Sequence, residues 1–138
     1  MIVVDASAIL EVLLNTPAAE RIGKRLFAVG QSLHAPHLLD LEVVQVLRRR
    51  WLAGDLGPKR STEALDDLAN LRLTRYSHTL LLPRIWSLRH NFTAYDAAYL
   101  ALAEELRVPL LTCDRALASS HGHAARVELI GTSSAGLD

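Results

Sequence analysis

The sequence alternates short apolar runs with longer segments of helical character, and this alternation limits the fold more than any other feature. Residues 1–4 form a continuous apolar run with β-branched side chains, and residues 108–113 form a second one. Such runs are typical of strands buried on both faces. Further strands are predicted at 32–35, 73–76 and 127–130. Because helices separate these strands, we expect crossover connections and an α/β fold, a parallel sheet with helices on both faces.

Helices are expected to fill the intervals between the strands. Leu and Ala together number 46, against 14 Ile plus Val, and this ratio favours helices over an all-β fold. A length of 138 residues fits one domain, with 131–138 as a frayed tail. One helix is expected to end near residue 90, with Pro83 in its first turn or at a kink. The other helices are predicted at 6–14, 17–28, 36–53, 61–71, 94–106 and 114–120.

Charge and cysteine content restrict the cellular context. The 15 basic and 15 acidic side chains balance, so the chain has no overall field of the kind found in histone-like proteins. Cys113 is the only cysteine, which excludes an intrachain disulfide and suits the cytosol. The first five residues do not form a secretory leader, and the longest uncharged stretch, 26–39, is too short and polar to cross a membrane. We therefore expect a cytoplasmic protein with no membrane segment.

Two acidic residues come directly after predicted strands. Asp5 ends the first apolar run and Asp114 ends the run at 108–113, and a helix follows each of them. Either carboxylate could simply be a helix N-cap. In a parallel sheet, however, ligands bind beyond the carboxyl ends of the strands, and both residues lie at that edge. Together they indicate a functional site more strongly than either does alone.

Two further acids lie on predicted helices. Asp96 is the third residue after Thr93, a spacing that resembles a capping box. Glu42 lies in an otherwise apolar helical segment, where its alternative role is a pair with Arg49. Asp40 lies about 200° around the same helix from Glu42, so it is expected to favour the helix dipole rather than share a site.

If these four acids converge, they form a site for a hard divalent cation. Clustered carboxylates repel one another unless a cation is present, and Mg²⁺ or Mn²⁺ prefers oxygen ligands. His121 and His123 are expected to lie in an exposed loop, and no His or Cys set suggests zinc. Outside the four acids the chain has 15 basic against 11 acidic residues, and the run Arg48–Arg50 suits phosphate unless it is only a solvated helix end. These features point to a phosphodiester substrate.

Several other enzyme classes lack their characteristic residues. Phosphoryl-acceptor sites need a lysine near the phosphate, but Lys24 and Lys59 lie away from the strand ends. The sequence contains no Gly-x-Ser-x-Gly turn, Walker loop or Gly-x-Gly-x-x-Gly motif. Cys113 has no evident His and acid partners, so it is interpreted as a small buried strand residue.

Taken together, these segments resemble the PIN-domain family. The resemblance rests on residues 2–7 (IVVDAS), on Glu42, on residues 93–104 (TAYDAAYLALAE) and on residues 110–114 (LLTCD). Chain length and residues 85–89 (IWSLR) make the chain most similar to VapC-type toxins of bacterial toxin–antitoxin pairs. The resemblance covers nearly the whole chain, so residues 1–138 are expected to be a single PIN domain.

The resemblance implies a PIN fold with a parallel sheet of about five strands and a Mg²⁺- or Mn²⁺-dependent endoribonuclease activity. It also implies a homodimer or a higher toxin–antitoxin assembly, a small antitoxin, and an RNA substrate such as transfer or ribosomal RNA. Two alternatives stay open: a catalytically silent PIN domain that binds RNA or protein, and a housekeeping RNA-processing nuclease. The implied metal ligands and catalytic residues are Asp5, Glu42, Asp96 and Asp114, with Ser7 and Thr112 as supporting polar groups.

Overall fold

A five-stranded, fully parallel sheet forms the centre of the molecule. The computed structural model describes residues 1–131. The strand order across the sheet is β3-β2-β1-β4-β5, so the first strand of the chain is the central one. Every neighbouring pair is parallel, which confirms the predicted architecture. The strands are β1 (Ile2–Val4), β2 (Leu33–Pro36), β3 (Leu73–Tyr76), β4 (Leu110–Thr112) and β5 (Val127–Leu129).

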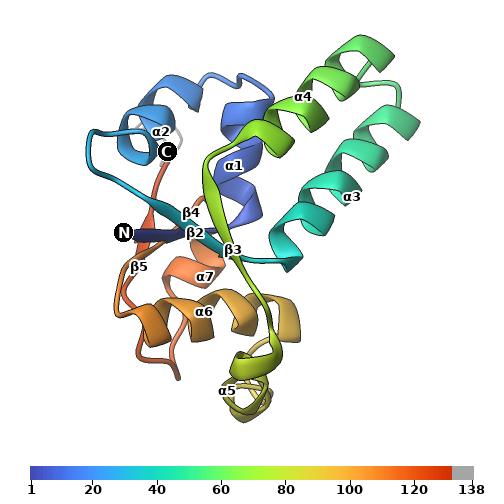
Figure 1. Ribbon diagram of the computed structural model, residues 1–138. Helices are drawn as coiled ribbons and strands as arrows, with labels where there is room; N and C mark the ends of the chain where they lie inside the picture. The colour runs from blue at the N-terminus through green and yellow to red at the C-terminus, as the bar shows by residue number, and fades with distance from the viewer. Residues whose placement is uncertain (132–138) are drawn as a thin grey trace.

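Helices cover both faces of this sheet, as predicted. Figure 1 shows one group of helices on one side of the sheet and a second group on the other. The first group is α1 (Ala6–Leu13), α2 (Ala19–Leu26), α3 (Leu38–Leu52) and α4 (Pro58–Asn70). The second group is α5 (Leu82–Ser87), preceded by the 3₁₀ turn η1 (Thr79–Leu81), and α6 (Ala94–Leu106). The short helix α7 (Arg115–Ala118) connects β4 to β5.

The strand order changes direction between β1 and β4. From β1 the chain moves outward through β2 to β3, and it then returns to place β4 on the other side of β1. Such a reversal leaves a crevice at the carboxyl ends of the two strands, because their following segments diverge. Asp5 directly follows β1, and Asp114 comes two residues after β4. The two strand-end acids therefore flank the point where ligands bind in open parallel sheets.

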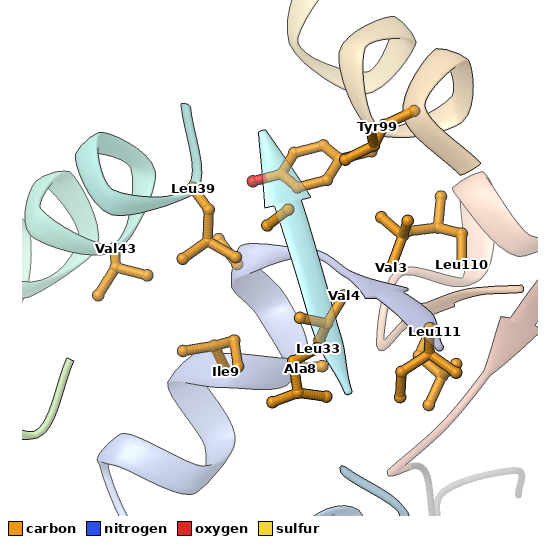
Figure 2. Packing of buried hydrophobic residues seen from close by; sticks show 14 of the residues in the cluster. Val3, Val4, Ala8, Ile9, Leu33, Leu39, Val43, Tyr99, Leu110 and Leu111 are labelled. Atoms are coloured by element: carbon orange, nitrogen blue, oxygen red, sulfur yellow. The ribbon is translucent and has the colours of Figure 1, made fainter. Parts of the chain in front are cut away.

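The interior is built around α6, which packs against three strands. The run from Ala97 to Ala103 is buried throughout, and the Tyr99 ring is among the largest fully buried side chains. The small alanines of this run let the helix approach the sheet closely, and Leu100 is fully buried in the core. Figure 2 shows Tyr99 in this cluster with Val3, Leu110 and Leu39. Among the helices described, none is long and apolar enough to span a membrane.

The structure shifts several predicted boundaries by a few residues, and two of these differences are instructive. The helix expected to end near residue 90 is a 3₁₀ turn followed by a helix that ends at Ser87, and Pro83 lies in the first turn of α5. The strand predicted at 108–113 covers only Leu110–Thr112, because the N–H of Cys113 donates to the Ser7 hydroxyl instead of a neighbouring strand. Apart from residue 131, the predicted frayed tail lies outside the described residues.

Candidate active site at the carboxyl edge of the sheet

Asp5 is the most deeply placed of the four acids. Its carboxylate accepts hydrogen bonds from the Ser7 hydroxyl (2.6 Å) and the Ala8 N–H (3.2 Å) at Oδ1, and from the Thr112 hydroxyl at Oδ2. The residue is only 7% exposed. Burial raises the pKa of Asp5 to about 6, although the three hydrogen bonds lower it in part. A buried carboxylate with a raised pKa is a strong functional candidate.

The hydroxyls of Ser7 and Thr112 connect the ends of β1 and β4. Ser7 Oγ also accepts the Cys113 N–H at 2.9 Å, and Thr112 Oγ1 accepts the Asp114 N–H at 3.0 Å. The strand register places Val4 beside Leu111, so Asp5 and Thr112 lie at the same level of the sheet. The structure thus places both predicted supporting residues directly against Asp5.

Glu42 reaches the same edge from the second turn of α3. Its Oε1 accepts a hydrogen bond of 2.6 Å from the Tyr99 hydroxyl. In Figure 2 this hydroxyl oxygen points from α6 toward α3. Burial raises the pKa of Glu42, and the nearby charge of Asp96 raises it further, while the bond from Tyr99 opposes both effects.

Asp96 and Asp114 complete the cluster from two different helices. Asp96 lies in the first turn of α6, where Thr93 caps the helix by accepting the Asp96 N–H at 3.1 Å. Burial and the charge of Asp114 raise the pKa of Asp96. Asp114 is exposed and caps α7, with Oδ1 accepting the N–H groups of Ala116 (2.9 Å) and Leu117 (3.2 Å).

The four acids form one electrostatic cluster. The charge of Glu42 acts on Asp5, that of Asp96 on Glu42, and that of Asp114 on Asp96. Acids spread over more than a hundred positions are thus linked in a series of neighbouring pairs. Asp5 and Asp114 also cap α1 and α7. A role as a helix cap and membership of the acidic cluster are therefore compatible for both residues.

The donor chemistry of the cluster fits a hard divalent cation. All candidate ligands are carboxylate oxygens, and in residues 1–131 none of Asp5, Glu42 and Asp96 forms an ion pair with Lys or Arg. Within the same residues, however, no three His, Cys, Asp or Glu side chains lie close enough together to hold a metal ion. Asp5 and Glu42 instead accept hydrogen bonds from protein hydroxyls.

An open cleft of about 560 Å³ extends from this cluster between α1 and α3. Ser7 and Glu42 lie in its wall together with Arg49 and Tyr95. Both Arg49 and Glu42 are described, and no ion pair joins them, so the alternative explanation for Glu42 is wrong. Sequence reasoning missed Tyr99, whose signal is its spacing of three residues from Asp96 on one helix.

Neighbouring residues fall outside the cluster for identifiable reasons. Asp40 is held by Arg75, whose Nε and Nη2 donate to its two oxygens at 2.7 and 3.0 Å. Burial raises the pKa of Cys113 to about 11, which makes its thiol a poor nucleophile. His121 is exposed, as expected for its loop, whereas His123 is half-buried, bonded to Ser120 at 3.1 Å and packed edge-on to a phenylalanine ring.

Comparison with known proteins agrees with this architecture. Residues 2–120 match the PIN domain. The chain is 39% identical over 130 residues to Ribonuclease VapC12 of Mycobacterium tuberculosis (strain ATCC 25618 / H37Rv), covering 94% of this chain and 99% of the relative. It is 42% identical over 129 residues to Ribonuclease VapC1 of the same strain, covering 93% and 96% of the two chains.

A solved structure shares the fold. The crystal structure of Mycobacterium tuberculosis VapC20, a Sarcin-Ricin loop cleaving toxin, superposes with a TM-score of 0.66 at 18% identity, over 90% of this chain and 97% of that one. At this identity the likeness concerns the fold alone, but the family match and the curated relatives extend over nearly the whole sequence. The chain therefore belongs to the PIN-domain family, among the relatives of the mycobacterial VapC ribonucleases.

Proposed function

We propose that this protein is a Mg²⁺- or Mn²⁺-dependent endoribonuclease and the toxin of a toxin–antitoxin pair. The relatives that cover almost its full length are named as ribonucleases. A structure of VapBC2 from Rickettsia felis, bound to a promoter DNA fragment, shares the fold with a TM-score of 0.54 at 12% identity over 83% of this chain and 89% of that one. These findings support RNA as the substrate and a small antitoxin as the partner.

One observation carries the proposal: a buried carboxylate with a raised pKa lies at the strand-order reversal, and charge interactions link it through Glu42 to Asp96 and Asp114. In this proposal Asp5, Glu42, Asp96 and Asp114 hold the metal ion. When bound, the ion supplies positive charge that stabilises the transition state of phosphodiester hydrolysis and lowers the pKa of the attacking water. Deprotonation of the raised-pKa acids is therefore linked to metal binding.

The protein groups around the acids orient them. The hydroxyls of Ser7 and Thr112 fix both oxygens of Asp5, and the Tyr99 hydroxyl fixes Glu42. Each hydroxyl can rotate to release its carboxylate when an ion competes for it, because a hydroxyl both donates and accepts. The single-domain organisation, the homodimer and the cytoplasmic location belong to the same proposal.

The test is to express the chain in cells, recover RNA and map new 5′ ends. Wild-type protein should generate defined ends, and Asp5→Asn should generate none. Asp67→Asn on α4 is the matched control, since it makes the same chemical change at an exposed position and should cleave like wild type. Unchanged cleavage by Asp5→Asn contradicts the proposed site.

The same expression experiment, together with thermal melting of the purified protein, distinguishes the toxin from the two alternative functions. A catalytically silent domain would yield no new ends and no thermal stabilisation by Mg²⁺ or Mn²⁺. A housekeeping nuclease would cleave RNA without arresting growth. Cleavage together with growth arrest, reversed by a small protein encoded beside the gene, is the outcome expected for the toxin.

A further inference from the structure

Three consecutive arginines lie on α3, and the structure separates their roles. Arg48, Arg49 and Arg50 are all exposed. Only Arg49 lines the 560 Å³ cleft, and its two neighbours are not part of that wall. Successive residues of a helix point about 100° apart, so the flanking arginines are directed to either side of the cleft.

Arg49 shares one stripe of α3 with Glu42. Glu42, Gln45 and Arg49 follow the i, i+3, i+7 spacing of one helix face, and all three line the cleft. Seven residues correspond to about 10 Å along the helix axis. Arg49 and Glu42 therefore line the same cleft, with their positions on α3 about 10 Å apart along the helix axis.

The remaining wall of the cleft includes apolar and aromatic side chains, some of them exposed. Leu10 and Leu41 line it, and Leu41 is 71% exposed. Tyr95 lies next to Asp96 in sequence, lines the same cleft and is 60% exposed. An exposed aromatic ring can stack on an unpaired base, and a guanidinium fork matches a phosphate.

We propose that this cleft carries the RNA strand away from the acidic cluster, and that Arg49 binds a backbone phosphate flanking the scissile one. The inference rests on the proposed ribonuclease function and adds the path of the substrate. A strand that approaches four carboxylates is repelled by them, and a cation in the adjoining cleft offsets that repulsion. Arg49 is in this view a binding residue, and Arg48 and Arg50 are not.

The experiment measures RNA binding apart from cleavage. Fluorescein-labelled single-stranded RNA of mixed sequence is titrated with Asp5→Asn protein, which leaves the strand intact, and anisotropy is followed at several salt concentrations. Arg49→Gln in this background should weaken binding by roughly 5- to 20-fold and reduce the salt-dependence slope by about 0.7, the contribution of one phosphate on a single strand. Arg48→Gln and Arg50→Gln should retain both the affinity and the slope.

Clear outcomes overturn the proposal. Equal affinity and slope for Arg49→Gln, equal losses for all three variants, or no RNA binding at low salt would each do so. RNA affinity unaffected by Arg49→Gln is also the result expected if a partner protein, rather than RNA, fills the cleft. Thermal melting confirms that each variant is folded, and Arg49→Lys should recover part of the affinity through its charge.

Failure of this inference is distinguishable from failure of the proposed function. If Asp5→Asn abolishes cleavage but Arg49→Gln binds normally, only the strand path is wrong. If Asp5→Asn still cleaves RNA, the proposed active site is wrong whatever Arg49 does.

Discussion

Asp5 and Asp114 hold equivalent places at neighbouring strand ends, yet their surroundings differ. Each follows a central strand, and each caps the next helix through Oδ1. Asp5 is 7% exposed and receives three hydrogen bonds, whereas Asp114 is exposed and receives two bonds from backbone N–H groups of α7. The local motif therefore sets where an acid lies, and burial is what raises the pKa of Asp5.

Substitution of each acid by its amide should reveal this difference most clearly in activity. Asp5→Asn is expected to lower RNA cleavage by roughly a thousandfold or more, because Asp5 is the most deeply buried acid of the cluster. Asp114→Asn is expected to lower it by roughly 10- to 100-fold, since an exposed ligand is more easily replaced by water. Initial rates on one RNA substrate compare the two, and equal losses would mean that burial is irrelevant to the role of each acid.

Stability of the metal-free protein should change in the opposite direction. The pKa of Asp5 is about 6 in the folded state against 3.8 for the ordinary group, so the folded state favours its protonated form. Protonated Asp5 therefore contributes to the free energy of unfolding. This stabilisation is fully present below pH 3.8 and is lost as the pH rises through 6, which lowers the free energy of unfolding by about 3 kcal/mol. Asp5→Asn should therefore be more stable than wild type at pH 8.

Thermal or urea unfolding in EDTA at pH 4 and pH 8 measures this effect. The advantage of Asp5→Asn should shrink toward pH 4, where wild-type Asp5 is protonated. Asp114→Asn serves as the control and should show no comparable gain at pH 8. Added Mg²⁺ or Mn²⁺ should stabilise wild type more than Asp5→Asn. A less stable Asp5→Asn protein at pH 8 would show that its hydrogen bonds outweigh its burial.

The Thr112 hydroxyl should shift the pH dependence of cleavage. It donates to Asp5 and thereby lowers the pKa of that carboxyl. Thr112→Val removes the donor at similar volume, so the rise of activity with pH should move to higher pH. The variant should lose more activity at pH 6 than at pH 8, by a few-fold. An equal loss at both pH values would indicate a purely structural role.

The smallest effect is expected from the cap of α7. Asp114→Ala should lower the free energy of unfolding by about 1 kcal/mol, because two backbone N–H groups lose their acceptor. Asp114→Asn keeps an acceptor oxygen and should be nearly neutral. Urea denaturation at pH 7 resolves the two. Equal destabilisation by both variants would show that charge, rather than hydrogen bonding, supports this helix.

The fold was largely predictable because its signals are local. Apolar runs ended by Asp5 and Asp114 identify the central strands, and helical intervals between strands require a parallel sheet. The segment before Asn91 was harder to predict: Pro83 lies in the first turn of α5, one of the two positions expected for it, but a 3₁₀ turn precedes the helix, which ends at Ser87. The position of a proline within a helix depends on where the preceding turn begins, and the sequence pattern does not show that.

The acids of the candidate site and the two hydroxyls beside Asp5 could be named from the sequence, but the group that orients Glu42 could not. Carboxylates at strand ends are visible in a sequence, whereas the pairing of Tyr99 with Glu42 depends on how α6 and α3 pack across the sheet edge. Which of the three adjacent arginines lines the cleft likewise depends on the rotation of α3 about its axis, and only Arg49 does so. Both the Tyr99–Glu42 hydrogen bond and the position of Arg49 follow from tertiary packing, which fixes the rotation of each helix about its axis.

The central place of β1 has a consequence for synthesis of the chain. Asp5 leaves the ribosome early, but the hydroxyl that holds its Oδ2 lies 107 residues later, on the strand that completes the other side of β1. A nascent polypeptide therefore cannot assemble the acidic cluster until almost the entire domain has emerged.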